Sequence, residues 1–193
     1  MPPYIATSLR QILVLASPGR EDIIDAVAIC GPAPVSELSE FLGRSRHSLY
    51  YHLRALRDAG LLIETLHPAK GKKTTARYDL PGRPMIVRYD LSSKRSRNAV
   101  IKLGHGRFRA AERGFIRACH PDVAVVEGPR RNLWVAHLEG WLTDSDLESA
   151  NELFARLIDL FKNDDGTSRA GRKPYAVTWA ISPVLTRNRK PRG

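Results

Sequence analysis

The amino-acid sequence predicts an α+β fold, in which a helical front part ends in a β-hairpin and a smaller α+β module follows. Two observations predict it. Residues 5–80 show apolar stripes of helical period and then two short runs of strand character. After the proline-rich stretch 81–84, further helical and strand-like runs continue to residue 184. We therefore expect domains at 1–84 and 85–184, with a basic disordered tail at 185–193.

Four helices are expected in the front part. The first covers 5–16, and its apolar stripe would face solvent in a monomer. The second begins after Ser17, has Pro18 at its first position and ends at Gly31. The third covers 34–43 and closes at Gly43, in a position that favours positive φ. The fourth opens with Ser45 as its cap and ends at Gly60.

A hairpin follows these helices. Residues 61–66 and 77–80 have strand character, and the basic, turn-rich stretch 67–76 joins them. A short helix, a tight turn, a capped helix and a basic hairpin together make the winged helix-turn-helix pattern.

The charge of the chain points to a polyanionic partner. Thirty-one Lys and Arg against 20 Asp and Glu give a formal net charge of +11. Residues 43–78 carry a net +6, whereas residues 121–165 carry a net −6, so the front part is the expected contact. No apolar run approaches the roughly 20 residues that span a bilayer, and we expect a cytoplasmic protein without a membrane partner.

The fourth helix carries polar, cationic and aromatic side chains on the face opposite its leucines. Short polar groups near the start of such a helix suit base edges in the major groove of double-stranded DNA, and longer cations suit phosphates. The hairpin would lie on the flanking backbone or in the minor groove. The expected DNA-binding residues are Ser45, Arg46, His47, Ser48, Tyr50, Tyr51, Arg54, Arg57, Lys70, Lys72, Lys73 and Arg77.

Residues 8–80 resemble the ArsR-like winged-helix transcriptional regulators. The resemblance is carried by "LASPGREDIIDAV" and by "PVSELSEFLGRSRHSLYYHLRALRDAGLLIE". It implies a prokaryotic homodimer that binds an inverted repeat. The metal sensors of this family place cysteine in the helix before the turn, but "VSELSEFLG" contains none, so no metal site is expected. His52 stands where it can either anchor the fourth helix or contact DNA.

The rear half resembles, more weakly, the C-terminal extensions of some of these regulators, through "LWVAHLEGWLTDSDLESANELF" and "YAVTWAISP". We expect helices at 94–119 and 144–162, the first kinked or divided at Gly104-His105-Gly106 and the second capped by Thr143. Strands are expected at 85–90, 132–142 and 175–184. This module would serve dimerisation, sensing or both.

Four aromatic residues of the rear half are either core or the lining of a pocket for a small-molecule effector: Trp134, Trp141, Tyr175 and Trp179. A second basic strip at 94–113 either extends the DNA contact or pairs with the acidic rear helix.

The sequence lacks a Gly-rich phosphate loop, a G-x-S-x-G motif and an H-E-x-x-H motif, so we expect neither an enzyme nor a cofactor. The leading hypothesis is a homodimeric, sequence-specific transcriptional regulator. The alternative is a nucleic-acid-binding protein without sequence preference, either architectural or RNA-binding, which would use the same positive charge.

Overall fold

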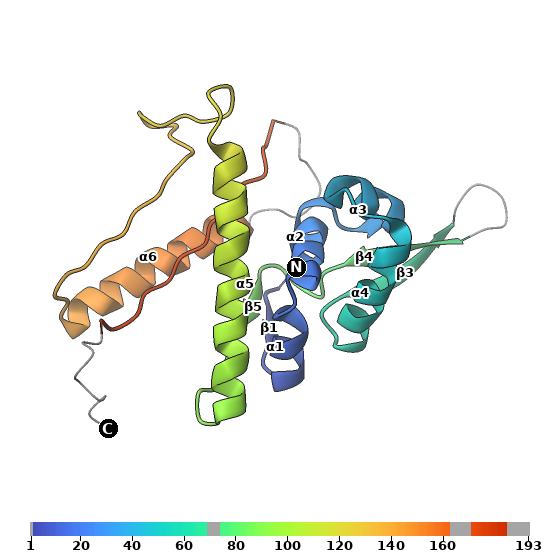
Figure 1. Cartoon of the computed structure of the whole chain (residues 1–193), viewed down its shortest axis with the longest axis horizontal. Coiled ribbons are helices and arrows are strands. Elements are labelled where there is room, and N and C mark those ends of the chain that lie inside the picture. The colour runs from blue at the N-terminus through green and yellow to red at the C-terminus, as the bar shows by residue number, and fades with distance from the viewer. Residues whose placement is uncertain (1, 69–73, 163–170, 185–193) are drawn as a thin grey trace.

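The computed structural model describes residues 2–68, 74–162 and 171–184 (Figure 1). Its helices and strands are, in chain order, β1 Tyr4–Ala6, α1 Leu9–Leu15, α2 Pro18–Cys30, β2 Ala33–Pro34, α3 Val35–Leu42, α4 Arg46–Asp58, β3 Ile63–Pro68, β4 Thr74–Asp79, β5 Met85–Val87, α5 Lys94–Ala118 and α6 Asp144–Lys162. One small sheet has the antiparallel order β2-β4-β3, and β1 pairs with β5 in a second, parallel one. The mixed α+β class is confirmed.

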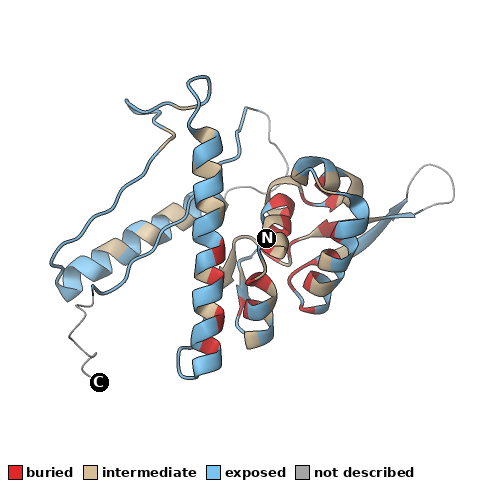
Figure 2. Ribbon diagram, in the orientation of Figure 1, coloured by how far each residue is buried: buried red, intermediate tan, exposed pale blue. Residues whose placement is uncertain are grey.

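The core lies where α1, α2, α3, α4 and one side of α5 meet (Figure 2). Leu49, Leu53 and Leu56 of α4 are buried there, at the helical spacing of four and three that the sequence shows. Leu38 of α3 and Ile23 of α2 pack in the same cluster. Burial of each such side chain contributes about 1.5–3 kcal/mol to folding, so α4 is fixed to the body along its inner face.

The expected helix at 5–16 is wrong in its first part. Residues 4–6 form β1, which pairs with β5, and α1 begins after Ser8. The Ser8 hydroxyl and the Gln11 side chain form a reciprocal capping box, which sets this start. Ile12 is buried, because α5 packs against α1. The expectation that the whole stripe of the first helix faces solvent is therefore also wrong.

The other three front helices are confirmed. Helix α2 has Pro18 at its first position and α4 has Ser45 as its N-cap. Gly43 ends α3 with φ of 61°, in the left-handed region that glycine occupies at no steric cost. The hairpin strands are also present, and both extend further towards the tip than expected.

Helix α5 runs through Gly104-His105-Gly106 without a break, so the expected interruption is wrong (Figure 1). Gly106 is buried, and a Cβ placed on it would lie 3.0 Å from Oε2 of Glu21 on α2. The absence of a side chain at this position lets the two helices approach. Glu21 Oε1 then accepts a 2.8 Å bond from Arg107 Nε of α5.

The rear half differs most from expectation. Helix α6 begins as predicted, because Thr143 and Asp146 cap it reciprocally. The strand expected at 85–90 is shorter, at 85–87, and pairs with β1 of the front part. No strand forms at 132–142 or at 175–184, so both strand predictions are wrong for the single chain. Both segments are extended and belong to neither sheet of the described residues.

Candidate nucleic-acid interface

The outward face of α4 carries the candidate interface. Arg46 and His47 lie in its first turn and are exposed. Tyr50 is 52% exposed and Tyr51 69%, one turn further along. Arg54, one turn beyond Tyr50, is exposed and lies 4.0 Å from Asp58. This face therefore presents cations and aromatic rings to solvent, while the leucines of the same helix hold it to the core.

Arg44, in the turn before α4, fixes the position of this helix. Its guanidinium forms an ion pair with Asp22 of α2 and donates a 3.3 Å bond to the Gly19 carbonyl oxygen. The Ser39 hydroxyl donates a 2.6 Å bond to the Arg44 carbonyl oxygen. Sequence reasoning missed this role of Arg44, because nothing in the local pattern tells a turn arginine that binds α2 from one that faces solvent.

Three of the expected DNA-contacting residues, Ser45, Ser48 and Arg57, form hydrogen bonds within the protein. The Ser48 hydroxyl donates a 2.8 Å bond to the Ser45 carbonyl oxygen, and the Ser48 amide donates to the Ser45 hydroxyl. Arg57 Nη1 donates a 2.6 Å bond to Glu64 of β3, and the guanidinium also binds Asp58. These bonds raise the pKa of Arg57, which stays charged but faces two carboxylates. Arg57 therefore joins α4 to the hairpin.

The sequence allowed His52 either to anchor α4 or to contact DNA, and the structure places it where it anchors α4. Its ring is partly buried against the start of α2, where a Cβ placed on Gly19 would lie 3.6 Å from its Nε2. Its Nδ1 is buried and has no hydrogen-bond partner among the described residues. Burial and the nearby cations Arg20 and Arg44 lower the pKa of His52, so the neutral imidazole is favoured. The ring of Tyr51 lies edge-on to it, 5.4 Å between centroids.

The β3–β4 hairpin projects from the body beyond α4 (Figure 1). Its register runs from Ile63 opposite Asp79 to Pro68 opposite Thr74. Arg77 lies within β4, opposite Thr65, rather than at the tip, and its Nη1 donates a 2.8 Å bond to the Pro32 carbonyl oxygen. The other expected wing cations, Lys70, Lys72 and Lys73, lie outside the described residues.

The basic side chains of the second strip, along α5, bind different partners within the protein. Arg107 and Arg113 bind the α2 carboxylates of Glu21 and Asp22. Arg97 donates to the carbonyl oxygens of the segment before α5. In the described parts of the chain no ion pair joins α5 to the acidic helix α6.

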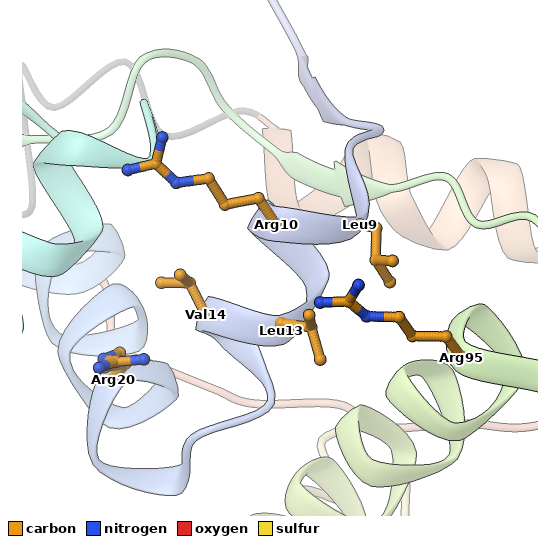
Figure 3. Close-up of a pocket in the computed structure, with 6 residues that line it drawn as sticks. All are labelled: Leu9, Arg10, Leu13, Val14, Arg20 and Arg95. Atoms are coloured by element: carbon orange, nitrogen blue, oxygen red, sulfur yellow. The ribbon is translucent and has the colours of Figure 1, made fainter.

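Shallow hollows lie between α1 and α5. One, of about 340 Å³, has Leu9, Leu13 and Val14 as its apolar part and Arg10, Arg20 and Arg95 around it (Figure 3). A second, of about 470 Å³, continues along α5 past Arg95 to Lys102. Neither includes an aromatic side chain.

The four aromatic residues of the rear half are not gathered together. Trp179 stacks on Phe154 of α6, with ring centroids 5.4 Å apart, and Arg131 lies over the ring of Trp134. Trp141 is fully exposed, and Tyr175 is exposed as well. An effector site at these residues stays a prediction.

No described helix has the length and apolar character needed to cross a membrane. No curated protein matches the chain. Residues 15–65 match the model of a family of helix-turn-helix domains. The match begins at the end of α1, includes α2, α3 and α4 whole, and ends within β3. The chain therefore contains a helix-turn-helix domain, the module of DNA-binding regulators, and α4 is the last of the three helices that the match includes whole.

Proposed function

We propose that this protein is a sequence-specific transcriptional regulator of the ArsR-like winged-helix type. Helix α4 would enter the major groove, and the hairpin would lie on the flanking backbone or in the minor groove. The exposed face of α4 is the observation that carries the proposal. Arg46, His47, Tyr50, Tyr51 and Arg54 all face solvent on a helix whose other side is fixed in the core.

The protein would act as a homodimer on an inverted repeat. A single α4 reads only a few base pairs, whereas two copies place two such helices on half-sites one helical turn apart. Arg46 is the best candidate for a base contact, because its guanidinium has no ion-pair partner among the described residues. Arg54 and the hairpin would hold phosphates and so set affinity rather than sequence preference.

Selection from a random DNA library tests this proposal. Full-length protein is incubated at about 150 mM salt with excess competitor DNA, because phosphate contacts alone weaken steeply with salt. Enrichment of an inverted repeat would support the regulator. Retention of random fragments without a shared sequence would instead support the alternative, a nucleic-acid-binding protein without sequence preference.

A further inference from the structure

Residues 132–142 and 175–184 have strand sequences, but neither segment has a strand partner among the described residues. In the second segment, Tyr175, Val177, Trp179 and Ile181 alternate with smaller residues, so all four would lie on one face of a strand. In the first segment, Leu138 is 89% exposed and Trp141 is fully exposed. Such runs expose unpaired backbone groups as well as apolar side chains, and both features call for a covering partner.

Helix α6 also has apolar side chains that nothing in the described chain covers. None of its side chains that the structure describes is buried (Figure 2). Phe154 stacks on Trp179, so α6 already lies against one face of the segment 175–184. Leu153 and Leu160, seven residues apart and hence on one side of the helix, remain exposed. Helix α6 thus lies on one extended segment that belongs to neither described sheet, and a second such segment, 132–142, precedes α6 in the chain.

The exposed area measures how much surface lacks a partner. A folded monomer of 21.6 kDa exposes about 9,200 Å², whereas this chain exposes 14738 Å². The 23 residues outside the description account for at most about 3,700 Å² of the difference, the area of a fully extended segment of that length. At least about 1,800 Å² per chain remains, twice the roughly 800 Å² per partner of a standard interface.

We propose that a second copy of this chain covers the rear half, with segments 132–142 and 175–184 of both copies pairing as strands of one shared sheet. The two α6 helices would cover that sheet. A pair of strands is marginal alone, whereas three or more strands with a helix on one face make a stable layer. One chain supplies two such segments and two chains supply four. This inference rests on the proposed homodimer and identifies its interface.

The charge of the region argues against nucleic acid as the occupant. Residues 121–165 hold ten acidic and four basic side chains, a net −6 that repels phosphates. A two-fold interface needs only a surface that complements itself. Extended segments with apolar side chains and free backbone edges meet that condition, because each edge can pair with its own copy.

The test uses exposed side chains, whose replacement leaves the packing within one chain intact. The double variant Leu138→Glu, Trp141→Glu places a charge on each face of the proposed strand, so one charge lies in the covered layer whichever face α6 covers. Leu66→Glu is the matched control, since Leu66 is 69% exposed on β3 of the hairpin. Leu13→Glu tests the competing face between α1 and α5. Mass is measured by light scattering during size exclusion over a concentration series, and backbone amide exchange is followed by mass spectrometry.

We expect the parent and Leu66→Glu to have twice the 21.6 kDa of one chain. The double variant should dissociate, with a dissociation constant raised at least roughly 30-fold, as for a central interface residue. Amides of 133–142 and 175–182 should be protected in the parent and unprotected in the double variant. The inference is overturned by a monomeric parent, by a double variant that stays dimeric, or by dissociation caused only by Leu13→Glu.

DNA selection separates this inference from the proposed function. A dimeric parent that enriches no sequence would leave the interface standing and refute sequence-specific reading. A monomeric parent that enriches a single half-site would refute the interface while DNA reading stands.

Discussion

Gly104 and Gly106 lie two residues apart in α5, and their alanine variants should have different stabilities. A glycine inside a helix costs about 0.5–1 kcal/mol relative to alanine, because it loses more backbone freedom on folding. A Cβ at Gly104 meets nothing within 4 Å. Gly104→Ala should therefore raise the free energy of unfolding by about 0.5–1 kcal/mol, or roughly 1–4 °C in Tm for a chain of this size.

Gly106→Ala gains the same backbone term but meets Glu21. Its Cβ would lie 3.0 Å from the buried carboxylate, which must then shift by a few tenths of an ångström. That shift disturbs the 2.8 Å bond from Arg107. Because Arg107 is partly exposed, the ion pair itself contributes little, but a buried carboxylate without its donor costs about 1–3 kcal/mol. Gly106→Ala should therefore be less stable than Gly104→Ala by about 1–3 kcal/mol.

Urea unfolding followed by circular dichroism at 222 nm measures both variants under the same conditions. The comparison between them removes the helix propensity term, which is common to both. If Gly106→Ala stabilises the chain as much as Gly104→Ala, then Glu21 is not held against α5 as the structure shows, and the reasoning about this contact is refuted.

Three further predictions follow from the same structure. Arg46→Ala should lose about 1–3 kcal/mol of discrimination at one base pair of a selected site, whereas Arg57→Ala should leave base preference unchanged in the same competition assay. Leu53→Ala should lower the free energy of unfolding by about 2–5 kcal/mol, because Leu53 is 1% exposed, while Leu66→Ala stays within about 0.5 kcal/mol in urea titrations. Burial raises the pKa of Glu21 above 4.5, so ionisation of this carboxyl lowers the free energy of unfolding as pH rises past that value. In urea titrations, the free energy of unfolding of Glu21→Gln should therefore increase relative to that of the parent between pH 4.5 and neutrality. A difference between the two proteins that does not change with pH would contradict this.

The parts of the fold that the sequence predicts well are those set by neighbours in the chain. Ser45 caps α4, Gly43 ends α3 and Thr143 caps α6, and each signal lies within a few residues of the boundary that it sets. Pairings across the chain have no such signal. Strand β1 pairs with β5, about 80 residues away, and its sequence "YIA" also fits the start of a helix. Ion pairs such as Arg107–Glu21 are invisible for the same reason.

In the candidate site, too, some features could be predicted from the sequence and others could not. Periodicity alone separates the buried leucines of α4 from its exposed face, so residues such as Arg46 and Tyr50 could be named from the sequence. Periodicity does not show which exposed cation has a partner. Arg57 and Arg77 were expected to contact DNA as Arg46 was, yet Arg57 binds Glu64 and Arg77 binds the Pro32 carbonyl oxygen.

Asp22 connects the turn before α4 to α5. Its two carboxylate oxygens bind different elements: one pairs with Arg44, in the turn before α4, and the other lies 3.4 Å from Arg113 of α5. Helix α5 leads into the rear half, where we place the contact with a second copy. The distance between the two α4 helices of a dimer would then depend on α5, and α5 is fixed to the start of α4 through one side chain. Half-site spacing would therefore be set by the same α2–α5 contacts that Gly106 permits.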